Sequence, residues 1–308
     1  MRSIAIINQK GGVGKTTTAV NLAAALADFG QRVWLIDLDP QAHASLHLGL
    51  VPDERQPTVY NALTERTPLG TVRHHVSTNL WVTPSHLDLA AAELELANEV
   101  GREMILRDLI EQDPAEFDTV IIDCPPSLGV LTLNALTACR EVILPLQPHF
   151  LALHGVSKLL QTVEIVAKRL NRELRLSGVV FCMCEGTTRL ANEVIGDVEA
   201  FFNTEREKGS LWSDAAIYET RIRKNVRLAE APSFGQSIFE YAPNSNGAID
   251  YLALATEVMA GDRIRNPAVG LMGFKNDLSK SSPPISSSSY HTTGSMEQNG
   301  IRSAKFMP

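Results

Sequence analysis

Short runs of apolar residues recur along the chain, and segments with a helical period of apolar positions separate several of them. Such alternation is typical of a parallel sheet that helices cover on both faces. The runs predict strands at residues 4–7, 33–36, 80–82, 120–122, 141–145 and 179–183. The periodic segments predict helices at residues 16–29, 88–110, 156–170, 191–202 and 247–259. We therefore expect an α/β fold.

The pattern changes near residue 261, where polar residues and prolines replace the periodic apolar positions. Serines repeat at 286–289, and Pro283 and Pro284 follow two further serines. Such a segment buries too little apolar surface to offset the entropy of ordering it. We expect one domain over residues 1–260, which is long and apolar enough for a large core, and a disordered tail over residues 261–308.

Composition and charge limit the classes of function. The chain of 308 residues has 28 basic and 35 acidic residues, a net charge of -7, so any contact with a polyanion must use a local basic patch. Neither a secretion signal nor a stretch of about 18 apolar residues that could span a bilayer is visible in the sequence. The four cysteines, which fall mostly in apolar runs, fit a reducing compartment. We expect a cytoplasmic protein that does not bind membranes.

A glycine-rich loop with the sequence NQKGGVGKTT follows the first predicted strand and precedes the first predicted helix, at residues 8–17. Glycines let a backbone approach phosphates closely, and the amides at a helix N-terminus attract anions. Lys15 can then reach the β and γ phosphates, and the Thr16 hydroxyl can ligate Mg²⁺. A plain glycine turn with a solvated lysine fits less well, because a strand precedes and a helix follows. The loop predicts a nucleotide site.

Lys10 is a second lysine in this loop, and an ordinary P-loop does not need it. The usual pattern is glycine, four residues, then Gly-Lys-Ser/Thr, but Gln9 holds the place of the first glycine. One lysine suffices to hold one nucleotide, so Lys10 requires a role of its own.

Two further strands are predicted to end in carboxylates beside this loop. The first ends at Asp37 and Asp39, and the second ends at Asp123 in a Walker B arrangement. Ligands of open α/β sheets bind at the carboxyl ends of the strands, so these carboxylates are expected near the same nucleotide. Asp37 and Asp39 point to one side, where one could orient a water on Mg²⁺ and the other the attacking water. Either could instead cap the next helix.

Four segments of the chain closely resemble the ParA/Soj family of partition ATPases, which carry a deviant Walker A motif. They are KGGVGKTT (10–17), DLDPQ (37–41), IDCPP (122–126) and NVRLAEAPSFG (225–235). The resemblance covers about residues 1–260 and implies a single-domain P-loop NTPase fold with a mostly parallel, twisted sheet. It also implies an ATPase with ATP and Mg²⁺ as its cofactors and slow intrinsic turnover.

The resemblance implies that two subunits enclose two nucleotides and form a homodimer when ATP binds. Lys10 would reach across to the phosphates of the partner subunit, and Asp39 would orient the hydrolytic water. The residues expected to bind the nucleotide of their own subunit are Gly11, Gly12, Val13, Gly14, Lys15, Thr16 and Thr17. The residues expected to serve Mg²⁺ are Thr16, Asp37 and Asp123.

A basic cluster in the C-terminal part matches a further property that the resemblance implies, namely DNA binding without sequence preference in the ATP state. The cluster contains Arg221, Arg223, Lys224 and Arg227, with Arg189 upstream. Several such side chains can neutralise several phosphates, although a solvated basic face is an alternative for each of them. Two segments depart from the family pattern, which reads Ile-Pro-Arg-Asn where this chain has Ile222-Arg223-Lys224-Asn225 and has an arginine near Thr187.

The resemblance implies that the protein segregates or positions a chromosome, plasmid or other cargo on the nucleoid, with a ParB-like partner that stimulates hydrolysis. Two other functions are open. A MinD-like membrane ATPase would need a C-terminal amphipathic helix, for which residues 300–308 offer few apolar and basic positions. An iron protein of the nitrogenase type would need two cluster cysteines, and Cys124 and Cys139 are the candidates.

Overall fold

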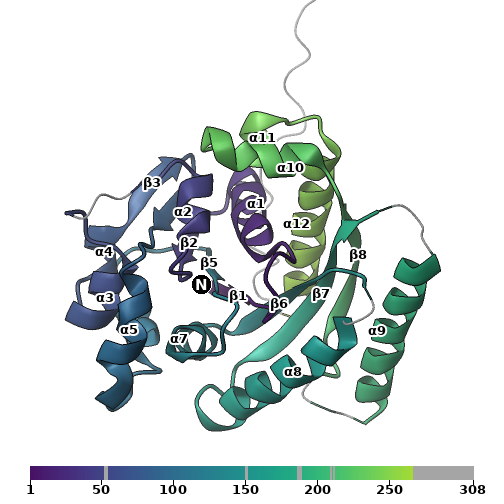
Figure 1. Ribbon diagram of the computed structural model, residues 1–308, viewed down its shortest axis with the longest axis horizontal. Helices are drawn as coiled ribbons and strands as arrows, with labels where there is room; N and C mark the ends of the chain where they lie inside the picture. The colour runs from purple at the N-terminus through teal and green to yellow at the C-terminus, as the bar shows by residue number, and fades with distance from the viewer. Residues whose placement is uncertain (52–54, 150–151, 186–188, 209, 211, 266–308) are drawn as a thin grey trace, which may run out of the picture. The chain divides into compact units, whose positions relative to one another are not determined.

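A twisted sheet runs through the computed structural model, which describes residues 1–51, 55–149, 152–185, 189–208, 210 and 212–265. It has eight strands in the order β3-β4-β2-β5-β1-β6-β7-β8, and all neighbours pair in parallel except β3 and β4 (Figure 1). The strands are β1 (Arg2–Ile6), β2 (Val33–Asp37), β3 (His74–Ser77), β4 (Leu80–Thr83), β5 (Thr119–Asp123), β6 (Glu141–Leu146), β7 (Arg175–Cys184) and β8 (Ala216–Arg223). The predicted α/β fold is confirmed.

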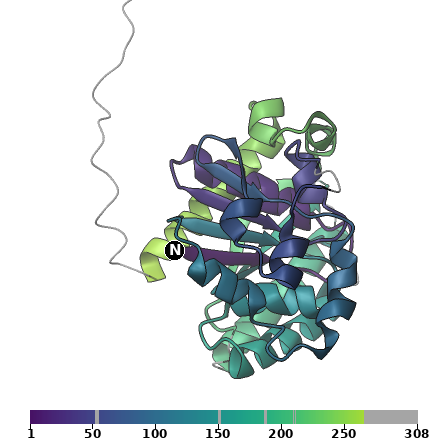
Figure 2. The same cartoon turned by 90° about the vertical axis from the view of Figure 1, so that its left-hand side faces the viewer.

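Helices pack against both faces of the sheet, and Figure 2 shows the sheet between the two helical layers. One face packs against α1 (Lys15–Asp28), α2 (His43–His47), α10 (Val226–Glu230), α11 (Ile238–Tyr241) and α12 (Asn246–Arg265). The other packs against α3 (Val59–Glu65), α4 (Leu69–Val72), α5 (Leu89–Glu95), α6 (Ile105–Gln112), α7 (Val130–Ala138), α8 (Ala152–Arg169) and α9 (Arg189–Glu207). Two 3₁₀ turns, η1 (Leu96–Asn98) and η2 (Ala231–Phe234), complete the described elements.

The apolar run at residues 4–7, in β1 and just after it, reflects burial on both faces of the sheet. Ile4 and Ile6 are fully buried in the layer with α1 and α12, whereas Ala5 and Ile7 are buried in the opposite layer. Side chains alternate between the faces of a strand, so a strand covered on both faces needs apolar residues at successive positions.

One predicted element is wrong in extent. The helical pattern over residues 88–110 is divided into α5, η1 and α6. Gly101 lies between them with a φ of +78°, a left-handed conformation that interrupts a right-handed helix and that glycine adopts without a Cβ clash. The periodic apolar positions persist across this break because both helices pack on the same layer.

Met1–Arg265 forms one compact unit. The predicted tail begins within this unit, because α12 continues to Arg265. Residues 266–308 of that tail lie outside the described residues. The C-terminal segment on which the membrane alternative depends lies there as well. In the part of the chain that the structure describes, no helix combines the length and the apolar character that crossing a bilayer requires.

Glu141 of β6 anchors the end of the sheet opposite the carboxyl ends of the strands. Its two oxygens accept hydrogen bonds from the Arg2 guanidinium at 2.8 and 2.9 Å, and the Ser177 hydroxyl and Arg175 also donate to it. Burial raises the pKa of Glu141, but the hydrogen bond and charge of Arg2, assisted by Ser177 and Arg175, outweigh burial and lower the pKa below its ordinary value. The network joins the starts of β1, β6 and β7.

Replacing Glu141 by alanine should lower the free energy of unfolding by about 3 kcal/mol, because Arg2 loses its buried carboxylate. A carboxyl with a lowered folded pKa stabilises the protein above its unfolded pKa of about 4.3, and this stabilisation is lost as pH falls through the folded pKa. Wild type should therefore lose stability more steeply than the variant in acid. Urea unfolding across pH checks both effects, and Glu173→Ala, which breaks an exposed ion pair with Arg140, is the control.

Candidate functional site

The glycine-rich loop connects β1 to α1 at the carboxyl edge of the sheet (Figure 1). Gly12 and Gly14 have φ angles of +74° and +93°, which side chains disfavour. Gly14 precedes the first residue of α1, so the free amides of that helix N-terminus belong to the loop. The loop therefore has the geometry of a phosphate-binding turn.

Lys15 and Lys10 differ in their surroundings. The Lys15 side chain is buried, and its Nζ donates a hydrogen bond to the carbonyl of Lys10 at 3.1 Å. Burial lowers the pKa of Lys15, while the charges of Asp123 and Asp39 oppose this shift. Lys10 is exposed on the outer side of the loop. One lysine thus faces the carboxylates, and the other is exposed at the surface.

Asp123 is a buried carboxylate without a hydrogen bond. Asp123 ends β5 and lies directly beside Asp37, the last residue of β2. Neither oxygen of Asp123 has a hydrogen-bond partner among the described residues. Burial raises its pKa well above the ordinary value and the negative charge of Asp37 raises it further, while the nearby Thr16 hydroxyl opposes the shift. A buried, unpaired carboxylate costs free energy, so its presence beside the loop suits a bound cation.

Asp37 is fully occupied by hydrogen bonds within the protein. Its Oδ2 accepts from the amide of Ser45 at 2.8 Å and from the Ser45 hydroxyl at 2.7 Å, and its Oδ1 accepts from the amide of Asp39 at 3.2 Å. Burial raises the pKa of Asp37 to about 6, although these hydrogen bonds lower it in part. Asp39 is also buried, and its Oδ1 accepts from the amide of Gln41 at 3.0 Å. The structure thus brings the three predicted carboxylates to one edge of the sheet.

These residues fit Mg²⁺ bound together with phosphates. Clusters of three or more His, Cys, Asp or Glu side chains suited to a metal do not occur in the described ranges. Mg²⁺ usually keeps several waters and binds through one or two carboxylates plus substrate phosphates, so such a cluster is not needed. The oxygens of Asp123, which lie beside the phosphate-binding loop, can supply the carboxylate ligand of a Mg²⁺ ion that is also bound to the phosphates.

Helix α2 connects this site to the C-terminal part of the chain. Ser45 of α2 binds Asp37, and His47 at its other end forms a hydrogen bond with the backbone of Gln236. Burial lowers the pKa of His47 to about 4, so it is neutral at physiological pH. Gly49 and Gly235 pack so closely that a Cβ on Gly235 would lie 2.9 Å from the Cα of Gly49. One short helix thus contacts both the carboxylate edge and the segment after η2.

The basic cluster surrounds the ends of β7 and β8 and is largely ion-paired. The pairs are Arg189–Glu193, Arg223–Asp250, Lys224–Glu185 and Arg227–Glu230. Arg223 makes the strongest contact, because its Nε and Nη2 both bind Asp250. Arg221 forms no ion pair with the residues that the structure describes. Thr187, where the sequence departs from the family pattern, lies outside the described residues.

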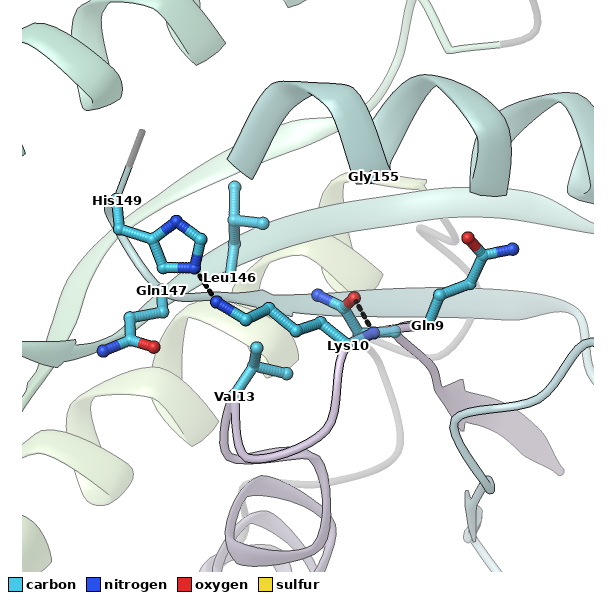
Figure 3. Close-up of a pocket in the computed structure, with 8 residues that line it drawn as sticks. Gln9, Lys10, Val13, Leu146, Gln147, His149 and Gly155 are labelled. Atoms are coloured by element: carbon cyan, nitrogen blue, oxygen red, sulfur yellow. Dashed lines mark hydrogen bonds between the residues drawn. The ribbon is translucent and has the colours of Figure 1, made fainter. Parts of the chain in front are cut away.

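Sequence reasoning missed three side chains that shape the site. Asn8 donates to the carbonyl of Pro145 at 2.7 Å and accepts from the amide of Lys10 at 2.9 Å, which fixes the loop to the end of β6. Ser45 holds Asp37, and His149 contacts Lys10 (Figure 3). Asn8 could have been found, since an asparagine at the start of a turn often bonds to the amide two residues later.

The cysteines proposed for other chemistry are buried. Cys124 and Cys139 are fully inaccessible, and burial raises the pKa of both thiols. Cys182 is buried, whereas Cys184 is half-buried, and Met183 between them has a left-handed φ of 55°.

Known proteins share this sequence and fold. A family model described as an AAA domain matches residues 1–176. Chromosome partitioning protein ParA of Myxococcus xanthus is 42% identical over 267 residues, which cover 86% of this chain and 90% of the relative. Sporulation initiation inhibitor protein Soj of Bacillus subtilis is 45% identical over 258 residues, which cover 83% and 98%. Cobyrinic acid a,c-diamide synthase from Mycobacterium smegmatis, solved with an ATP analogue and magnesium, has a TM-score of 0.72 at 33% identity and covers 87% of this chain and 97% of that chain.

The parallel sheet and the glycine loop between β1 and α1 define a P-loop nucleoside triphosphatase. Within that class, the sequence identity extends over most of the chain and not only over the loop. The chain belongs to the ParA/Soj family of partition ATPases. It is therefore an ATPase, as its motifs predict.

Proposed function

We propose that this ATPase is a switch that dimerises when it binds ATP, binds DNA in that state and positions a cargo until a ParB-like partner triggers hydrolysis. The observation that carries the proposal is the separation of the two loop lysines. Lys15 is buried among carboxylates of its own subunit, whereas Lys10 is exposed at the surface, from which it can reach another subunit.

The loop and the carboxylates divide the work on ATP and Mg²⁺. Gly11 to Thr17 would bind the phosphates through their amides, and Lys15 would neutralise the β and γ oxygens. Asp123 and Thr16 would hold Mg²⁺, which supplies positive charge to the phosphates, and Asp37, beside Asp123 on the adjacent strand, would add negative charge for the cation. Asp39, which is buried at the same edge, would orient the attacking water.

The dimer would bring Lys10 of each subunit to the phosphates of the other. A cation delivered in trans stabilises the charge that develops on the phosphoryl oxygens during transfer. Gly11 supports close approach between loops, because no atom lies within 4 Å of the position that a Cβ on Gly11 would take. An ATP-dependent dimer built on such a loop would persist while hydrolysis is slow, which is what a switch requires.

The basic cluster would bind DNA phosphates without reading sequence. Exposed ion pairs contribute little stability, so Lys224, Arg227 and Arg189 can exchange their carboxylates for phosphates at low cost. Arg221 can bind a DNA phosphate without first breaking an ion pair to any of the described residues. Arg223 is held by two bonds to Asp250, so we expect it to act mainly on the structure.

DNA binding tests the proposal directly. With ATP and Mg²⁺, the protein should bind a DNA duplex of arbitrary sequence. Its affinity for the duplex should fall steeply as the salt concentration rises from roughly 50 to 200 mM. Arg221→Ala should weaken binding and reduce the salt slope by about one per subunit. Arg140→Ala, at the opposite end of the sheet, is a matched control that should bind as wild type. If ATP promotes no salt-sensitive binding, the proposed DNA function is wrong.

A further inference from the structure

A pocket of about 250 Å³ lies beside the glycine loop, outside the cluster of carboxylates. Figure 3 shows that the loop forms one wall and that the segment after β6 forms another. The lining residues from the loop are Asn8, Gln9, Lys10 and Val13, and those from the other segments are Leu146, Gln147, His149 and Gly155. Among these residues Lys10 carries the only permanent charge.

Lys10 extends across this pocket to His149. Its Nζ contacts Nε2 of His149, and the side chain passes over Val13 (Figure 3). An ammonium group has three donors and no acceptor, so Lys10 donates in this contact and Nε2 of His149 accepts. The contact therefore holds Lys10 within its own subunit.

The backbone around both residues is fixed, so the contact does not depend on two freely moving side chains. Asn8 binds the carbonyl of Pro145 in β6 and the amide of Lys10, which sets the loop against the end of that strand. The amide of His149 donates to the carbonyl of Gln147 at 2.9 Å, which turns the chain back toward the loop. Both ends of the contact thus rest on the end of β6.

We propose that His149 is a positioning residue that holds Lys10 at rest in the monomer and competes with the phosphates of the partner subunit. This inference rests on the proposed role of Lys10 in the dimer. Each subunit must break its Lys10–His149 contact before Lys10 can cross the dimer seam. The contact lowers the fraction of monomers that are ready to dimerise, and because both subunits must be ready, the apparent affinity of the dimer falls by the square of that fraction.

Dimerisation of full-length protein measures this competition. With Mg²⁺ and a non-hydrolysable ATP analogue, His149→Ala should dimerise at a protein concentration about ten- to a hundredfold lower than wild type, because the loss of one hydrogen bond in each subunit contributes roughly three- to tenfold per subunit. His149→Gln, whose amide oxygen can still accept from Lys10, should restore the wild-type concentration. Gln147→Ala, which lines the same pocket without touching Lys10, should match wild type. Equal dimerisation of wild type and His149→Ala, or weaker dimerisation of the variant, would overturn the proposal.

Lysine labelling separates this inference from the proposed function. In nucleotide-free protein, an amine-reactive acylating reagent followed by peptide mass spectrometry should modify Lys10 faster in His149→Ala than in wild type, with the exposed Lys224 as the internal reference. His149→Gln should again resemble wild type. If wild type fails to dimerise with ATP but Lys10 labelling follows these expectations, the switch function fails while the resting contact stands. Unchanged Lys10 labelling in His149→Ala removes the contact itself.

Discussion

Replacing Lys10 by alanine should leave the monomer able to bind ATP and abolish the ATP-driven dimer. The Lys10 side chain is exposed and contacts His149. The Lys15 side chain is buried and interacts electrostatically with the carboxylates of Asp123 and Asp39. The nucleotide of the same subunit therefore keeps its main cation in the variant. Only the charge offered to a second subunit is lost.

The expected loss in turnover is large. A cation that a second protein supplies to a transferring phosphoryl group raises kcat by about 10³- to 10⁵-fold in GTPases. Partner-stimulated hydrolysis by Lys10→Ala should therefore be slower than that by wild type by a factor of about a hundred or more. Light scattering coupled to gel filtration measures the dimer, and a fluorescent ATP analogue measures nucleotide binding.

Lys15→Ala provides the contrast, because it should lose nucleotide binding itself. The pair of variants thus separates a residue that acts within its subunit from one that acts across the seam. A Lys10→Ala protein that forms ATP-dependent dimers as readily as wild type would show that Lys10 is only a solvated surface lysine.

The central strands could be predicted from sequence because they are buried on both faces. β1, β2, β5 and β6 are continuous apolar runs, and the prediction located each of them. β3 and β8 were missed because they lie at the edges of the sheet. β8, for example, mixes buried Tyr218 and Ile222 with exposed Arg221 and Arg223 and contains no apolar run.

The candidate site could be predicted where its residues adjoin an apolar strand. The glycine loop and Asp123 follow such strands directly, so their meeting at one edge follows from the parallel order of β1, β5 and β2. Their hydrogen-bond partners could not be predicted. Ser45 lies eight residues from Asp37, and Asp250 lies 27 residues from Arg223, and only the folded chain brings them together.

This difference changes the interpretation of the basic cluster. Counted from sequence, it offers five positive charges, whereas in the fold four of them face carboxylates. DNA binding through this surface then requires exchange of partners, and the affinity should depend on the carboxylates as well as on the lysine and arginines. The acidic residues are thus part of how such a surface can bind DNA reversibly.

The second large effect concerns Asp123. Asp123→Asn should reduce ATP hydrolysis by about two to three orders of magnitude, because the neutral amide lacks the negative charge that holds Mg²⁺ beside the phosphates. In nucleotide-free protein the same substitution should raise the melting temperature. The Asp123 carboxylate is buried without a hydrogen-bond partner in the described chain and faces the negative Asp37 on the adjacent strand, so removing its charge relieves both costs.

Calorimetry with and without ATP and Mg²⁺ tests this opposition between activity and stability. Without nucleotide, Asp123→Asn should be more stable than wild type by about 1 to 3 kcal/mol, whereas adding ATP and Mg²⁺ should stabilise wild type more than the variant. Asp108→Asn, on the exposed surface of α6, is a control in which neither quantity should change greatly. A nucleotide-free Asp123→Asn protein that is less stable than wild type would mean that the Asp123 carboxylate holds the sheet together and is not kept at a cost for binding the metal.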